Sequence, residues 1–139
     1  MSASQLVSRG FHRLGLLLCL NASVALAADP VALTCSGKTW SPEDKLFNAP
    51  IPEQSLIIDA DKKEVITGAI GSYAITGATD AKVFFESDLY VYGKKAAGKM
   101  KGSIDRFTGS VIISSYDDGA DKPSSTYYLS CKPANAPLF

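Results

Sequence analysis

The feature that most constrains this chain is a repeated alternation of short apolar stretches with turn residues. The stretches contain β-branched and aromatic residues and recur about every eight to twelve positions. No segment keeps a sustained helical spacing. The pattern predicts a single-domain all-β protein, an antiparallel β-barrel or β-sandwich of about eight strands. The expected strands are 31–35, 55–59, 65–70, 73–76, 82–87, 89–92, 100–105, 110–116 and 126–132.

The prolines fit this assignment. Proline has no N–H to donate to a strand ladder, so it is expected outside the strands. All seven prolines lie outside the expected strands, at positions 30, 42, 50, 52, 123, 133 and 137.

A short helix is expected only at 41–49, where Ser41-Pro42-Glu43 resembles a helix cap followed by proline in the first turn.

The first segment has the pattern of a signal peptide. Residues 1–15 carry basic side chains and no acid, an apolar run follows over 14–20, and Ala25-Leu26-Ala27 has the small residues that a signal peptidase requires. We expect cleavage after Ala27, which leaves 28–139 as a single β domain in the periplasm or outside the cell. A membrane anchor needs about 18 apolar residues, and Asn21 interrupts the run too early. No transmembrane segment is therefore expected after cleavage.

Cleavage changes the chemical inventory. It removes the only histidine and one of three cysteines, leaving Cys35 and Cys131, and it leaves Arg106 as the only arginine. It also removes two of the 14 basic residues and none of the 14 acidic ones. This weakly acidic balance argues against a nucleic-acid partner, which requires a basic surface.

Two cysteines near the ends of an exported chain predict one disulfide. Cys35 and Cys131 each fall on the apolar face of their strand. A bond between them requires Cα atoms within about 7 Å, so the first and last strands would lie together, as in a closed barrel or a tightly packed sandwich. The bridge would restrict the unfolded chain by about 4 to 5 kcal/mol. A barrel this small is expected to fill its interior with side chains and to leave at most a small cavity.

The stretch 102–113 is expected to be a hairpin. The Asp105 side chain can accept hydrogen bonds from amides of the turn that contains Thr108, and Gly109 can take the positive φ that follows a type I turn. The alternative is that Asp105 and Arg106 form a site, but neighbouring acid–arginine pairs are more often surface ion pairs.

Three short phrases resemble a group of small exported proteins of Gram-negative bacteria: the segment 102–109, the opening 33–37, and the ending 128–133 with Leu138-Phe139. The resemblance implies an exported β protein with one disulfide and carries no activity. A fainter similarity is to periplasmic inhibitors of C-type lysozyme, which have a Ser-Gly-x-x-Tyr loop. The nearest counterpart here is Gly71-Ser72-Tyr73, with a different order and spacing.

Most catalytic chemistries are excluded by composition. Without histidine there is no Ser-His-Asp relay and no histidine metal site, and bridged cysteines supply no thiolate. No phosphate-binding glycine loop or dinucleotide fingerprint occurs, so no cofactor is expected. Carboxylate chemistry on a glycan remains as an alternative, and it needs two acids about 5 to 10 Å apart. Its candidates are Asp59, Asp61, Glu64, Glu86 and Asp88, which also suit solvated turns and strand ends.

Three further groups are candidate contacts. Lys94, Lys95, Lys99 and Lys101, with Arg106, could meet an anion or a partner, although such a lysine run more often guards a strand edge. Asp117, Asp118 and Asp121 could hold calcium, but their spacing matches no known loop. Tyr90 and Tyr92 are expected to share a strand face and could form a ligand platform, with Trp40 unplaced, although core packing is commoner. We expect a binding or envelope-associated module more than an enzyme, with an envelope protein, a glycan or a small apolar ligand as partner, and a lysozyme-inhibitor-like protein as the alternative.

Overall fold

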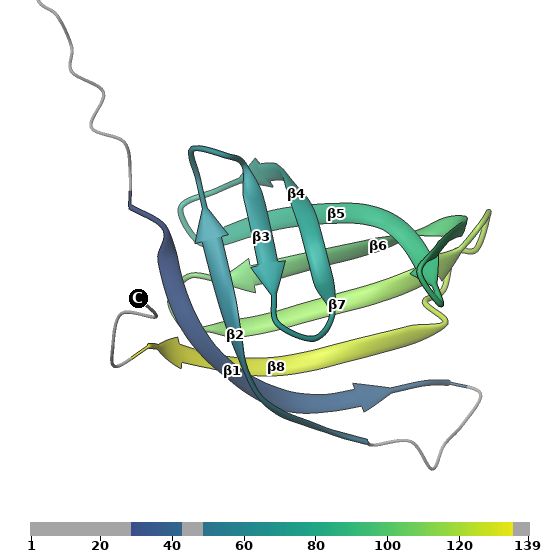
Figure 1. Ribbon diagram of the computed structural model, residues 1–139, viewed down its shortest axis with the longest axis horizontal. Helices are drawn as coiled ribbons and strands as arrows, with labels where there is room; N and C mark the ends of the chain where they lie inside the picture. The colour runs from purple at the N-terminus through teal and green to yellow at the C-terminus, as the bar shows by residue number, and fades with distance from the viewer. Residues whose placement is uncertain (1–28, 43–48, 135–139) are drawn as a thin grey trace, which may run out of the picture.

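A computed structural model describes residues 29–42 and 49–134, which form an eight-stranded closed antiparallel barrel (Figure 1). Each strand pairs with the next along the chain, and the last pairs with the first. The described residues contain no helix. The strands are β1 Val31–Trp40, β2 Pro50–Asp59, β3 Glu64–Thr67, β4 Gly71–Ala78, β5 Lys82–Val91, β6 Lys94–Asp105, β7 Ser110–Asp117 and β8 Ser125–Pro133.

The predicted disulfide closes the barrel. β1 pairs with β8 from Leu33 to Trp40, and Cys35 lies directly opposite Cys131 in this ladder. The two cysteines are bonded with their Cα atoms 4.1 Å apart, and both are buried. The all-β class, the strand number and the bridge between first and last strands are therefore confirmed, and the barrel replaces the sandwich alternative. The bridge is also consistent with an oxidising, exported location.

Side chains alternate between the inside and the outside of the barrel along each strand, and the inward ones fill its middle. In β6 and β7 the side chains of Met100, Ile104, Val111 and Ile113 point inward, while Lys101 and Ile112 between them face solvent. Phe85 lies opposite Gly102, and a Cβ on that glycine would overlap the Phe85 ring. Glycine at 102 therefore makes room for the aromatic ring. The buried core consists of Cys35, Leu56, Val65, Tyr73, Phe85, Met100, Ile104, Val111, Ile113, Leu129 and Cys131.

Two expectations about the strands were wrong. The two strands expected at 82–87 and 89–92 are one strand, β5, which ends at Val91 and whose ladder only shifts register between Asp88 and Tyr90, and Tyr92 lies in the following turn. The expected long loop at 93–98 shrinks to a turn, because β6 already begins at Lys94. Lysines and small residues hide the alternation there, since their positions face solvent and need no apolar side chain.

The proline expectation was also partly wrong. Pro50 and Pro52 lie in β2, and Pro133 ends β8. β2 meets β3 only from Leu56 to Asp59, so its first half has β1 as its one strand neighbour. Proline is tolerated there because one side of the strand needs no ladder donor.

Several expectations lie outside the described residues: the signal peptide 1–27, positions 43–48 of the possible helix, and the ending Leu138-Phe139. Within the described ranges, no helix has the length and apolar character needed to cross a membrane.

Candidate binding cavity

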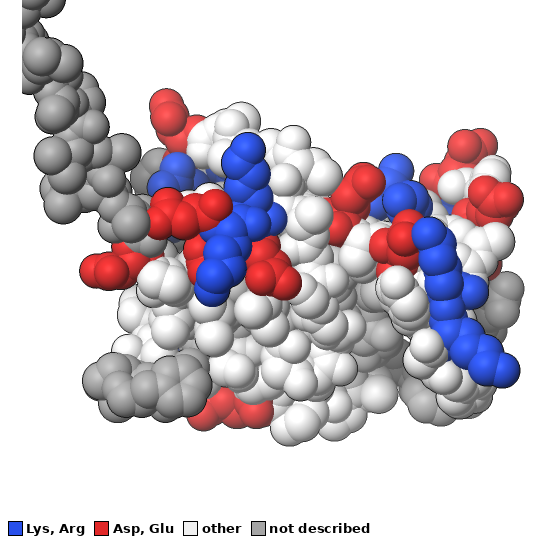
Figure 2. All heavy atoms as spheres, turned by 45° about the horizontal axis from the view of Figure 1, so that its top comes forward, with Lys and Arg blue, Asp and Glu red and all other residues white. Residues whose placement is uncertain are grey.

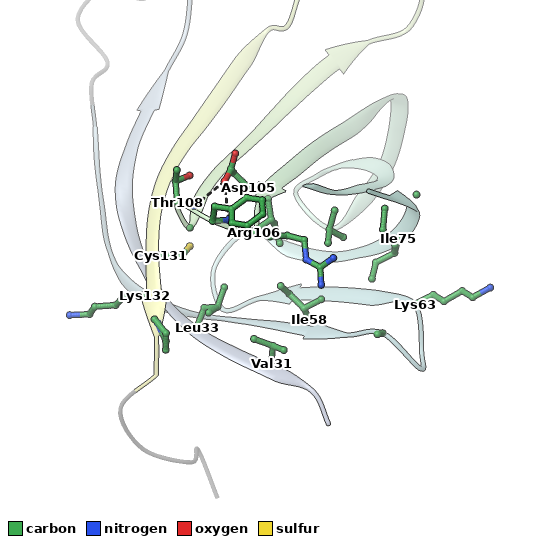
Figure 3. A pocket seen from close by; sticks show the side chains of 18 of the residues that line it. Val31, Leu33, Ile58, Lys63, Ile75, Asp105, Arg106, Thr108, Cys131 and Lys132 are labelled. Atoms are coloured by element: carbon green, nitrogen blue, oxygen red, sulfur yellow. Dashed lines mark hydrogen bonds between the residues drawn. The ribbon is translucent and has the colours of Figure 1, made fainter. Parts of the chain in front are cut away.

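One end of the barrel holds a cavity of about 880 Å³ (Figure 3). It lies where β1 begins and where β2, β4, β6 and β8 end, at the left of Figure 1. The interior was expected to leave at most a small cavity, and the space at this end is larger than that. The side chains that form its walls are mainly apolar: Val31, Leu33, Ile58, Ile75, Val83, Ile104 and Cys131.

The cavity exists because large core side chains are confined to the middle of the barrel. Tyr73 and Phe85 meet edge to face there, with ring centroids 5.2 Å apart. Burial raises the pKa of Tyr73, so its hydroxyl stays neutral and donates to the Ile70 carbonyl at 3.3 Å. Toward the cavity end the walls carry smaller residues, including Gly77 and Ala78. Glycine has no side chain and alanine only a methyl group, so this part of the wall takes up little of the space.

The hairpin between β6 and β7 forms part of the cavity mouth. Asp105 accepts hydrogen bonds from the amides of Phe107 at 3.0 Å and Thr108 at 2.9 Å. These amide hydrogen bonds, that of Thr108 above all, hold the pKa of the Asp105 carboxyl below its ordinary value. Gly109 has φ +70°, and its amide donates to the Asp105 carbonyl at 3.0 Å. The turn therefore has the hydrogen bonds and the glycine conformation that its sequence predicts.

The same turn places Arg106 and Phe107 at the mouth of a cavity that no sequence pattern indicated. Arg106 is exposed, and its Nη1 donates to the Thr79 carbonyl at 3.3 Å. Phe107 is 81% exposed although it is a large apolar side chain. A hairpin rich in turn residues was thus correctly expected, but its position over a cavity depends on strand register and closure of the barrel.

A second, smaller cavity of about 520 Å³ lies at the opposite end of the barrel, beside the β5–β6 turn. Tyr90 and Tyr92 line it, but Tyr92 lies in the turn with φ +49° and is fully exposed. Trp40 ends β1 and is outside this lining. The three aromatic residues therefore do not form one platform.

The lysine group lies on the outer surface of β6, partly neutralised by acids of β5. The Asp88 carboxylate pairs with Lys95 at 2.6 Å and with Lys99 at 2.9 Å. These hydrogen bonds, first that of Lys95, lower the pKa of Asp88, and Asp88 raises the pKa of Lys99. Lys101 lies 5.5 Å from the centre of the Tyr116 ring. Figure 2 shows that basic and acidic side chains intermingle at each end of the visible face, and that neither end is uniformly basic.

The five candidate catalytic acids serve turns and ion pairs. Asp59 accepts the Lys62 amide at 3.0 Å and pairs with the Lys62 ammonium, and both contacts lower its pKa. Glu64 accepts a hydrogen bond from Ser72. None of Asp59, Asp61, Glu64, Glu86 and Asp88 is part of the lining of the two barrel cavities.

The acidic turn after β7 lacks the geometry of a metal site. Asp117, Asp118 and Asp121 border a shallow depression on the surface. Across the part of the chain that the structure describes, no group of three or more metal-binding side chains is placed to hold an ion. The calcium alternative therefore has no geometric support.

The segment Gly71-Ser72-Tyr73, which was compared with the loop of lysozyme inhibitors, is part of β4. Tyr73 is almost completely buried in the core, while Ser72 is exposed. Comparisons of the chain with protein-family models, curated proteins and solved structures gave no match.

Proposed function

We propose that this protein binds a small apolar ligand in the cavity at the β6–β7 end of its barrel. The observation that supports this proposal is the cavity itself, which has a volume of about 880 Å³ and mainly apolar walls. Small-molecule sites are typically apolar concave spaces of about 300 to 1,000 Å³ with a few polar groups at defined positions. The cavity has this size, this lining, and a polar rim supplied by one hairpin.

The scaffold suits a binding protein. Closure by β1–β8 pairing and the disulfide holds the walls in place, so little conformational entropy is lost when a ligand enters. The signal-peptide pattern and the disulfide together support export, and we propose a bacterial periplasmic or secreted protein. The binding function and the exported location are independent proposals.

A fluorescence titration with the neutral probe N-phenyl-1-naphthylamine tests the function. We expect a saturable rise in fluorescence with one site per chain. Ile58→Trp introduces bulk from the cavity wall and should abolish binding. Ile66→Trp makes the same change on the outer face of neighbouring β3, where the side chain is 39% exposed, and should leave binding intact.

Urea midpoints of both variants establish that they are folded. Absence of probe binding to the wild-type protein would contradict the proposal. Equal binding by folded Ile58→Trp and wild type would also contradict it, because the probe would then occupy another place, such as the smaller cavity.

A further inference from the structure

Arg106 presents a cation to a cavity whose walls are mainly apolar. Its side chain extends from the β6–β7 turn over the cavity, toward Ile58 and Ile75 (Figure 3). The hydrogen bond from Nη1 to the Thr79 carbonyl, 3.3 Å, ties the guanidinium to the neighbouring β4–β5 turn. No carboxylate in residues 29–42 and 49–134 lies within ion-pair distance of this guanidinium. Its remaining donors have no carboxylate partner within that part of the chain.

The other charged residues of the lining do not balance this cation or repeat it. The Asp105 carboxylate turns back to its own turn amides. Lys63 and Lys132 extend away from the cavity in Figure 3, and Lys132 lies 4.0 Å from the Glu53 carboxylate. Asp29 also lines the cavity and makes no ion pair with Arg106. Arg106 is therefore the cation that a bound molecule would meet.

Phe107 gives a second, independent indication that a ligand binds at this mouth. Its ring stands at the same mouth with most of its surface exposed to solvent. Exposed apolar surface of this kind beside a cavity is stabilised when a ligand covers it. A molecule whose apolar body fills the cavity and reaches the rim would contact Phe107 and bring its head beside Arg106.

We infer that the ligand is an anionic amphiphile, with an apolar chain or ring in the cavity and one negatively charged headgroup bound by Arg106. This inference rests on the proposed function and adds the chemical class of the ligand. A guanidinium suits the role because it stays charged and donates two parallel hydrogen bonds to a carboxylate or phosphate.

The test compares three ligands with the same chain length: dodecanoate and dodecyltrimethylammonium below their micelle concentrations, and dodecanol below its solubility limit. Each displaces N-phenyl-1-naphthylamine from the wild-type protein at low salt. We expect dodecanoate to bind about 10 to 100 times more tightly than dodecanol, the range of a hydrogen bond to a charged group. The cationic ligand should bind most weakly. Added salt should reduce the preference for dodecanoate, because it screens exposed charges.

Arg106→Gln should bring the affinity ratio of dodecanoate to dodecanol close to one. Lys82→Gln removes one positive charge at the same end of the barrel but outside the lining, and it should keep the wild-type ratio. Equal binding of dodecanoate and dodecanol by the wild type, or a preference that persists in Arg106→Gln, would overturn the inference while leaving the cavity function intact. Failure of dodecanol and the neutral probe to bind at all would overturn the cavity function first.

Discussion

Replacing Gly109 should destabilise the protein for two separate reasons, its backbone conformation and a close contact with β8. Its φ of +70° is costly for a residue with a side chain, by about 1 to 2 kcal/mol. In addition, a Cβ at this position would come closer to the Cys131 carbonyl oxygen than the 3.0 Å that real Cβ atoms respect. That oxygen cannot move easily, because Cys131 is held in two ways. Its amide donates to the Gly109 carbonyl at 2.9 Å, and its side chain is bonded to Cys35.

The overlap adds about 1 to 3 kcal/mol, as inserted atoms do in packed sites. Gly109→Ala should therefore lower the free energy of unfolding by about 2 to 5 kcal/mol. Gly119 provides a matched control, since its φ is +72° and a Cβ there would meet no atom within 4 Å. Gly119→Ala should cost only the conformational part, about 1 to 2 kcal/mol.

Urea unfolding of the oxidised proteins, with equal slopes, measures both losses. The difference between the two variants isolates the contact with Cys131. Equal losses would show that the β6–β7 turn does not lie against β8 as described, and the reasoning about the cavity mouth would be wrong.

Three other substitutions test the frame around the cavity. Replacing Cys35 and Cys131 with serine should lower the free energy of unfolding by about 2 to 5 kcal/mol in urea, and an unchanged midpoint would mean that the bridge does not stabilise closure. Asp105→Ala should lower the urea midpoint at pH 7, because it removes the acceptor of the Phe107 and Thr108 amides. Because folding lowers the pKa of Asp105, its contribution is present at neutral pH and is lost as pH falls below the ordinary value of 3.8, so the Tm values of variant and wild type should converge in acid. A constant difference in Tm would refute this origin. Arg106→Ala should change the urea-derived stability by less than about 0.5 kcal/mol, since its side chain is exposed, and a larger loss would assign it a structural role.

The fold was largely predictable because its signals are local. The alternation of apolar and polar residues placed Val111 and Ile113 on one face. The same alternation put Cys35 and Cys131 on the apolar faces of the first and last strands. The β5–β6 region was less predictable, because lysines and alanines facing solvent lack the alternation that marks a half-buried strand.

The cavity could not be predicted from the sequence. Leu33, Ile58 and Ile104 have the pattern of ordinary core residues. The local sequence does not distinguish an inward side chain that packs against another side chain from one that lines a cavity. Arg106 belongs to a turn whose own hydrogen bonds are local, so its turn was predictable. Its position over the cavity depends on the pairing of β6 with β5 and β7.

The most direct test of the central claim is to locate a bound neutral probe by isotope-edited NMR. Intermolecular NOEs between N-phenyl-1-naphthylamine and methyl-labelled protein report which side chains the probe touches. The cavity account predicts NOEs to the methyl groups of Leu33, Ile58 and Ile75. NOEs confined to Ile51, Ile70 and Leu89, which line the opposite end of the barrel, would contradict it.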